Sequence, residues 1–337
     1  GAEGRMEKDL VPRAGYEIKT VRITNLHRSL KPADIKHNLA TLKNVLTATA
    51  EAKHIIREFQ PDVAVGTGGY VCYPVLKAAS ELGIPTAVHE SNAVPGLTTK
   101  MLEGSVNTIM VGFEESRANY RHPDRVEVTG TPVRVDFLDQ DKAAARRELG
   151  IPEGKPLVVS VWGSLGASHM NEIMTDFILR ACAKPFFSLI HSAGKAGYSK
   201  MSAALESEKP DYAKLGMDVR AYIYDMPRVM AAADLVLCRA GASTLAELTA
   251  MGKPAILVPS PNVTNNHQER NARVLEAAGG AKVMLEQEFT ADSLLGLVSE
   301  LLQHPGQLEE MSRNMLKLAV PDATDRIAAE VLELAAK

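Results

Sequence analysis

The sequence predicts an α/β protein in which two Rossmann-like parallel-sheet domains face a cleft. Short apolar runs alternate with longer helical patterns along the whole chain, as in parallel sheets built from βαβ units. The length of 337 residues suits two domains. A polar stretch ends in Ile151–Pro156, where two prolines and a glycine indicate a linker. We therefore expect domains over residues 1–150 and 151–320, with a last helix within 321–337 that packs back on the first domain.

Each expected strand is a short apolar run, and helical patterns separate most of them. The runs in the first half are Glu17–Ile23, Val63–Gly66, Thr86–His89, Thr108–Val111 and Val126–Thr129. Those in the second half are Leu157–Trp162, Phe186–Ser192, Val219–Tyr222, Leu235–Cys238, Ala255–Val258 and Lys282–Leu285. Ligands of such sheets bind beyond the carboxyl ends of the strands, so the turns that follow the strands are the places to search for a site.

Composition excludes several classes of function. The net charge of -3 and the low aromatic content of 5% argue against a nucleic-acid partner. No apolar run approaches a membrane span, and no leader sequence is found, so we expect a cytoplasmic protein. The three cysteines are scattered and the histidines lack ligand spacing, so we expect no metal and no cofactor. Asp139 and Asp141 form a DxD pair, which we interpret as helix capping in the linker.

The strongest candidate site lies where the expected strand Leu235–Cys238 runs into a small-residue turn and a helix. The backbone N–H groups of Ala242, Ser243 and Thr244 at the start of that helix suit a phosphate or diphosphate. Glu247 comes one turn later, where its carboxylate is placed to accept hydrogen bonds from a ribose diol. Thr244 and Glu247 also fit a capping box, and the pattern alone favours that simpler interpretation.

Two further turns of the second half follow expected strands. Gly163–Ser168 contains two glycines and two serines, which fit an anion cradle or a plain turn. Asn265–Asn271 begins a helix with several amide groups, which donate and accept and therefore suit sugar hydroxyls. A polar helix start is the simpler explanation of the second segment.

Three turns of the first half are also candidates. Gly66–Tyr70 is glycine-rich and fits either a second ligand or a tight left-handed turn. His89–Asn92 ends a strand with a His-Glu pair suited to acid/base work, although such residues are more often capping or surface residues. Pro132 fixes the turn before Arg134, which is then either a phosphate partner or a solvated arginine.

A basic and apolar stretch runs from Leu26 to Lys43. Such a stretch can rest on an anionic membrane surface. A solvated helix with one apolar face explains it equally simply, and the pattern alone favours that alternative.

Taken in this order, the segments resemble glycosyltransferase family 28, whose members include the GT-B enzymes that transfer N-acetylglucosamine (GlcNAc) from UDP-GlcNAc to lipid I. The resemblance covers essentially the whole chain. The first-half segments that carry it are Pro61–Val63, Gly66–Tyr70, His89–Asn92, Pro95–Thr98 and Gly130–Arg134. Those of the second half are Gly163–Ala167 with Asn171, Cys238–Thr244 with Glu247, and Asn266–Gln268 with Asn271 and Ala272.

The resemblance implies an inverting, metal-independent transfer that converts lipid I, undecaprenyl-pyrophosphoryl-MurNAc-pentapeptide, into lipid II for peptidoglycan. It implies a peripheral position on the inner face of the cell membrane. The implied donor-binding residues are Asn92, Arg134, Ser164, Ile223, Ala242, Ser243, Thr244, Leu245, Ala246, Glu247 and Gln268. The implied acceptor-binding residues are Gly68, Gly69 and Tyr70.

The beginning of the sequence departs from the family pattern. The family opens with a strand and a glycine-rich loop ending in Gly-His, whose histidine is a leading base candidate, and no counterpart is found near Arg5–Gly15. Glu90 is the remaining candidate for a general base. Leu165 and Ser168 also depart from the family, which usually has Gln and Arg there. Three expectations follow: a lipid I transferase, either active or inactive as this fragment, a non-catalytic UDP-sugar-binding module, or a GT-B transferase for another lipid acceptor.

Overall fold

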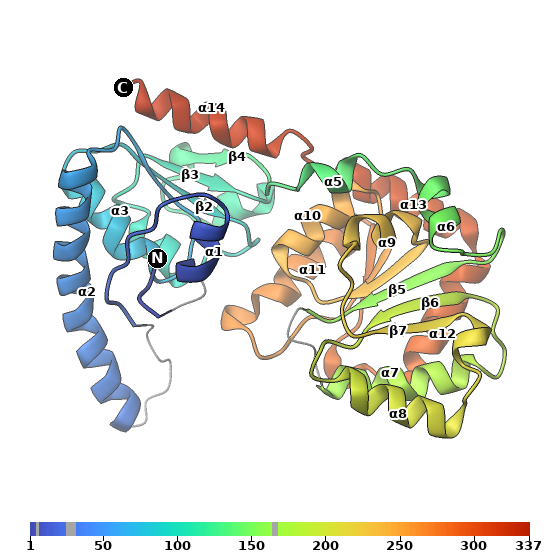
Figure 1. The fold of residues 1–337 in the computed structure, drawn as a ribbon. Helices are drawn as coiled ribbons and strands as arrows, with labels where there is room; N and C mark the ends of the chain where they lie inside the picture. Colours follow the sequence, from blue (N-terminus) through green and yellow to red (C-terminus); the bar gives the residue numbers. More distant parts are fainter. Residues whose placement is uncertain (5–6, 25–31, 164–167) are drawn as a thin grey trace. The chain divides into compact units, whose positions relative to one another are not determined.

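The structure is a computed structural model that describes residues 1–4, 7–24, 32–163 and 168–337. These residues form two compact units, one of residues 1–130 with 322–337 and one of residues 131–321 (Figure 1). The observed division precedes the expected boundary at residue 150. The linker residues 131–150 belong to the second unit because helix α6 (Lys142–Glu148) packs against helix α9 (Met226–Ala232).

The first unit is built on a four-stranded parallel sheet in the order β1-β2-β3-β4. The strands are β1 (Ala64–Gly66), β2 (Thr86–Glu90), β3 (Thr108–Val111) and β4 (Val126–Val128). All five residues of β2 are buried, as expected for an interior strand of a sheet covered on both faces. Its helices are α1 (Glu7–Arg13), α2 (Pro32–Phe59), α3 (Cys72–Glu81), α4 (Leu97–Leu102) and α14 (Ala323–Ala335).

The prediction of a strand over Glu17–Ile23 is wrong. This segment forms a single isolated parallel bridge, between Ala2 and Val21. Val21 is buried against Ala48 and Ala52 of α2. Its side chain is therefore held by a helix, and the segment is not a strand of the four-stranded sheet. The alternating apolar pattern of this segment therefore reflects burial against a helix and does not indicate a strand of the sheet.

The second unit has a six-stranded parallel sheet in the order β10-β9-β8-β5-β6-β7. Its strands are β5 (Leu157–Val161), β6 (Ser188–Ser192), β7 (Met217–Arg220), β8 (Leu235–Cys238), β9 (Ala255–Leu257) and β10 (Ala281–Val283). Helices α7 (Ser168–Ala181), α8 (Tyr198–Glu208) and α12 (Ala291–Gln303) lie on one side of this sheet (Figure 1). Helices α9, α10 (Ala242–Ala250) and α11 (His267–Ala277) lie on the other side, and α5 (Val135–Leu138) and α13 (Pro305–Lys317) contact α10.

The carboxyl ends of the central strands lie in register. Val161 of β5 pairs with Cys238 of β8, and Cys238 pairs with Leu257 of β9. The turns that follow these three strands therefore meet at one edge of the sheet, where ligands of such sheets bind.

Candidate functional site

Helix α10 begins directly after β8, and its first turn has no side-chain cap. Gly241 is the N-cap residue in an extended conformation, and among the described residues no side-chain cap bond is found at this helix start. Thr244 is the third helical residue, so the capping-box interpretation of Thr244 and Glu247 is wrong. Because the first backbone N–H groups of a helix have no partner within it, those of Ala242, Ser243 and Thr244 are available to an anion at this edge.

The turn between β8 and α10 is held in place by Arg239. This mostly buried side chain forms an ion pair with Glu286 at 2.6 Å and donates to the carbonyl oxygens of Val258 and Pro259 at 3.1 and 3.2 Å. Its guanidinium also lies 5.9 Å from the ring centre of Trp162, at the end of β5. Arg239 thus ties together the turns after three neighbouring strands, a role that the sequence pattern does not reveal.

Glu247 is the sixth of the nine residues of α10 and lies beside the segment that leads into α5. The guanidinium of Arg134 and the carboxylate of Asp136 both act electrostatically on Glu247, and burial raises the pKa of Glu247 to about 7. Arg134 is two-thirds exposed, pairs with Asp136 at 3.4 Å and lies 5.2 Å from the ring centre of Phe137. The structure therefore brings Arg134 and Glu247 together within the second unit, although the sequence placed Arg134 at the end of the first domain.

The remaining donor candidates of the second unit follow β5, β7 and β9. Ile223 is buried in the turn after β7, between Tyr222 and Tyr224, whose ring centres are 4.7 Å apart. Gln268, in the first turn of α11, accepts a hydrogen bond from the backbone N–H of Ser260 at 2.9 Å. Ser164 lies outside the described residues.

The acceptor candidates Gly68 and Gly69 lie in the turn between β1 and α3. Their φ angles are +81° and +77°, the left-handed region that favours glycine, so the expected tight left-handed turn is confirmed. The thiol of Cys72 donates to the carbonyl oxygen of Gly68 at 2.6 Å and fixes the turn onto α3. Tyr70 is half-buried.

Glu90 and Asn92 lie at the carboxyl end of β2 in the first unit. The carboxylate of Glu90 is buried and accepts hydrogen bonds from both the backbone and the side chain of Asn92. It also accepts from Gly96 and Thr99 at the start of α4. A general base must reach the acceptor hydroxyl, and these bonds already occupy both carboxylate oxygens.

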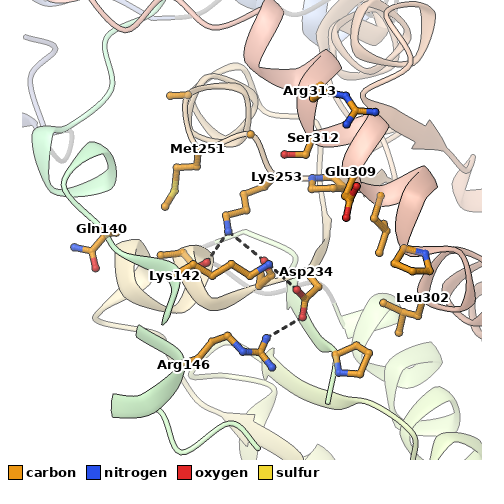
Figure 2. Close-up of a pocket in the computed structure, with 18 of the residues that line it drawn as sticks. Gln140, Lys142, Arg146, Asp234, Met251, Lys253, Leu302, Glu309, Ser312 and Arg313 are labelled. Carbon is orange, nitrogen blue, oxygen red and sulfur yellow. Dashed lines mark hydrogen bonds and ion pairs between the residues drawn. The ribbon is translucent and has the colours of Figure 1, made fainter. Parts of the chain in front are cut away.

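A cavity of about 940 Å³ lies at the opposite edge of the second sheet, where strands begin. Figure 2 shows that Lys142 and Arg146 point toward Asp234, which accepts from them at 2.6 and 2.9 Å. Lys253 donates to the carbonyl oxygens of Ala231 and Ala233 at the end of α9, and burial lowers its pKa to about 7. The sequence pattern does not reveal this cluster, since Asp234 and Lys253 come just before strands whereas Lys142 and Arg146 belong to the linker helix α6.

Three further expectations concern capping, metal and membranes. Asp141 accepts from the backbone N–H of Ala144 at 2.7 Å, which confirms the expected capping role for this member of the DxD pair. The described residues contain no group of three or more His, Cys, Asp or Glu side chains that could bind a metal ion. Within the same part of the chain, no helix is long and apolar enough to cross a bilayer.

The stretch from Leu26 to Lys43 is described only in part. Residues 25–31 lie outside the described residues, and α2 begins at Pro32. The expectation of a membrane-facing surface there stays a prediction.

Comparison with known proteins places both units in one family. Residues 1–111 match the N-terminal domain of glycosyltransferase family 28, and residues 157–327 match its C-terminal domain. The chain is 41% identical to the UDP-N-acetylglucosamine--N-acetylmuramyl-(pentapeptide) pyrophosphoryl-undecaprenol N-acetylglucosamine transferase of Acetivibrio thermocellus, over 97% of this chain and 86% of that one. It is 42% identical to the transferase of the same name from Thermoanaerobacter sp., over 97% and 88%.

Solved structures agree with this assignment. The crystal structure of MurG from Acinetobacter baumannii matches with a TM-score of 0.78 and 25% identity, covering 98% of this chain and 89% of that one. UDP-GlcNAc 2-epimerase from Neisseria meningitidis, solved with UDP-GlcNAc, shares the fold with a TM-score of 0.61 at 16% identity, over 97% and 90% of the two chains. The predicted GT-B class is confirmed, and the chain belongs to glycosyltransferase family 28.

Proposed function

We propose that this chain transfers GlcNAc from UDP-GlcNAc to lipid I and so forms lipid II in peptidoglycan synthesis. The observation that carries the proposal is the uncapped start of α10 with Glu247 and Arg134 beside it, in a family whose relatives are named for this reaction. The second unit binds the sugar nucleotide and the first unit binds the lipid acceptor.

The donor is bound through its phosphates and its ribose. The backbone N–H groups of Ala242, Ser243 and Thr244 receive the diphosphate, with Leu245 and Ala246 completing the same helical turn. Glu247 accepts from the ribose hydroxyls, Ile223 contacts the uracil, and Gln268 and Asn92 contact the sugar. Ser164 is a further phosphate contact in this proposal.

The reaction is an inverting displacement at the anomeric carbon. The departing UDP gains negative charge in the transition state, and the positive end of the α10 dipole stabilises that charge together with the guanidinium of Arg134. This arrangement performs the chemistry without a metal ion. The acceptor hydroxyl loses a proton to a base within hydrogen-bond reach.

The acceptor side uses the turn of Gly68, Gly69 and Tyr70, which faces the diphosphate of lipid I. The enzyme works on the inner face of the membrane, where anionic lipid attracts basic and apolar side chains. In the first unit, helix α4 offers exposed Leu97 and Met101 on either side of exposed Lys100.

Transfer from labelled UDP-GlcNAc to lipid I in detergent tests the proposed reaction. We expect lipid II to form with UDP-GlcNAc and not with UDP-glucose, and to form equally in the presence of EDTA. Turnover that requires added metal, or equal use of both donors, contradicts the proposal.

Sedimentation with vesicles tests the membrane position. Binding to phosphatidylglycerol vesicles and not to phosphatidylcholine vesicles supports it. The double variant Leu97→Ser, Met101→Ser is expected to bind less, while Leu316→Ser, an exposed residue of the second unit, is the matched control.

A further inference from the structure

The carboxylate of Glu90 is the centre of a saturated set of hydrogen bonds. Oε1 accepts from the backbone N–H of Asn92 at 3.2 Å and from its side-chain Nδ2 at 2.9 Å. Oε2 accepts from the backbone N–H of Gly96 at 2.9 Å and from Oγ1 of Thr99 at 2.8 Å. A carboxylate offers about four lone-pair directions, and here each oxygen receives two donors.

The position of Glu90 explains why these donors gather there. It is the last residue of the interior strand β2 and only 6% of its surface is exposed. An ionised carboxylate at such a position is costly unless it is fully hydrogen-bonded. The chain after β2 therefore wraps around it and supplies all four donors within nine residues.

The same carboxylate also organises the start of α4. Gly96 is the N-cap residue of α4 and offers no side chain to cap it. Oε2 of Glu90 accepts from the backbone N–H of Gly96 and from the side-chain hydroxyl of Thr99, the third helical residue, so it holds the first turn of α4 at two points. The segment 91–96 is thus fixed at both ends by one side chain.

A second set of contacts holds the middle of this segment. The hydroxyl of Ser116 donates to the carbonyl oxygens of Asn92 and Ala93, both at 3.1 Å. Asn119 donates to Ala93 at 3.3 Å. The backbone around Asn92 is therefore fixed from two sides, whereas its side chain is oriented by Glu90.

We infer that Glu90 is a positioning residue and not the general base: its carboxylate fixes the segment 91–96 and orients the side chain of Asn92, which is a sugar contact in the proposed function. This inference rests on the proposed function for its ligand, UDP-GlcNAc. A base needs a lone pair that reaches the acceptor hydroxyl, and the lone pairs of Glu90 are already used inside the protein.

The variant Glu90→Gln tests the inference, because it keeps the shape and replaces one acceptor oxygen by a donor. We expect KM for UDP-GlcNAc to rise roughly tenfold or more while the shape of the kcat pH profile stays unchanged. Hydrogen exchange of the segment 91–96 is expected to become faster. Glu103→Gln is the matched control, since Glu103 is as buried and accepts from the backbone of Arg121 and His122 away from this segment.

The variant Thr99→Val removes one of the four bonds and keeps the carboxylate, so it serves even where Glu90→Gln does not fold. We expect KM for UDP-GlcNAc to rise less in Thr99→Val than in Glu90→Gln. In the double variant, the fold-increase of KM is expected to be smaller than the product of the two single fold-increases. A fold-increase equal to that product contradicts a role shared by Glu90 and Thr99.

Three outcomes overturn the inference. A fall of kcat by about a thousandfold with unchanged KM and loss of the acidic limb of the pH profile makes Glu90 the base. Equal changes in Glu103→Gln make its role one of general stability. Unchanged hydrogen exchange in Glu90→Gln removes the positioning role. Absence of transfer by the wild-type chain contradicts the proposed function instead, and the exchange measurement then still decides the role of Glu90.

Discussion

Two glutamates, Glu90 at the end of β2 and Glu247 within α10, have opposite surroundings. Glu90 is enclosed by four donors of its own chain, whereas Glu247 is partly buried beside Arg134 and Asp136 with a pKa raised to about 7 by burial. A carboxylate that accepts hydrogen bonds from its own chain supports the structure. A carboxylate that is buried beside other charged groups, as Glu247 is, is a candidate for ligand binding. The residue type alone does not distinguish these two cases.

Replacement of Glu247 is expected to weaken the donor complex. Glu247→Ala leaves the ribose hydroxyls without their acceptor, which costs about 1–3 kcal/mol of binding free energy. Isothermal titration with UDP-GlcNAc measures this loss. Glu206→Ala, an exposed glutamate of α8, is the control, and an affinity equal to wild type in Glu247→Ala argues against the ribose role.

The affinity for UDP-GlcNAc is expected to rise with pH through about 7. In the proposed site the ionised form of Glu247 accepts from the ribose, so protonation of this carboxylate, whose pKa burial raises to about 7, is expected to compete with binding. Titrations between roughly pH 6 and pH 8 test this, since the diphosphate diester itself does not change charge there. Glu247→Gln is expected to bind without this pH dependence, and an equal dependence in both proteins assigns it to another group.

His191 links stability to pH. It is fully buried on β6, its Nδ1 lies 3.0 Å from Oγ of Ser160, and burial lowers its pKa to about 3. Because the folded pKa lies below the unfolded value of 6.5, its contribution is complete above pH 6.5 and is lost as the pH falls toward 3. We expect a loss of about 2 kcal/mol at pH 5 relative to pH 8.

Urea unfolding at the two pH values, followed by the fluorescence of Trp162, measures this loss. Trp162 is the single tryptophan and belongs to the same unit. The variant His191→Val is expected to show less of this pH dependence. A dependence as large as that of wild type places the responsible group elsewhere.

At the scale of elements, one edge of the second sheet carries the proposed donor site and the opposite edge holds the linker helix α6. Asp234 precedes β8 and accepts from the backbone N–H of Leu157 at 2.7 Å, besides Lys142 and Arg146 of the linker helix α6 (Figure 2). This carboxylate therefore joins α6 to the beginning of two strands. It explains why residues 142–148 belong to the second unit.

Asp234→Ala is expected to destabilise the second unit by about 2–4 kcal/mol, because it leaves a half-buried arginine and a strand N–H without an acceptor. The midpoint of denaturant unfolding, followed by Trp162, measures this change. Asp176→Ala removes an exposed pair with Arg180 and is expected to change stability by less than about 0.5 kcal/mol. Equal effects in the two variants contradict the role of Asp234.

At the scale of the whole molecule, the last helix completes the first unit. Leu334 of α14 is 4% exposed and packs with Ala87 of β2 and Met110 of β3, whereas Leu332 is 70% exposed. Leu334→Ala is expected to cost about 2–4 kcal/mol in the first unit, and Leu332→Ala less than about 0.5 kcal/mol. Calorimetry detects the lower unfolding temperature of the first unit in Leu334→Ala. The unfolding transition of the second unit, followed by Trp162 fluorescence, is expected to be unchanged, and a change in that transition contradicts the prediction.

Much of this architecture is predictable from local pattern. The runs Thr108–Val111 and Leu235–Cys238 are strands with the expected bounds, and the last helix covers Ala323–Ala335 as expected. Apolar periodicity determines such elements because a buried strand or helix face needs it. The expected strand Val219–Tyr222 is found at Met217–Arg220, where pairing with β6 decides the bounds.

Tertiary contacts account for what the sequence could not supply. Pattern placed Glu247 and the turn before it at a binding edge, but not the Arg239 contacts that hold this turn or the approach of Arg134. It also could not show that Glu90 is enclosed by Asn92, Gly96 and Thr99, since donors close in sequence do not reveal their orientation. Segments far apart in the chain, such as the linker and the start of β8, meet only through the fold.

The first unit combines residues 1–130 with 322–337, and the second unit is inserted between them. On a ribosome, residues 1–130 consequently emerge first but lack their closing helix until residues 322–337 have been made. The second unit, residues 131–321, is complete before that helix is made and is able to fold first. Nascent chains stalled before Ala323 should therefore display a protease-resistant core from residues 131–321 and a cleavable amino-terminal portion.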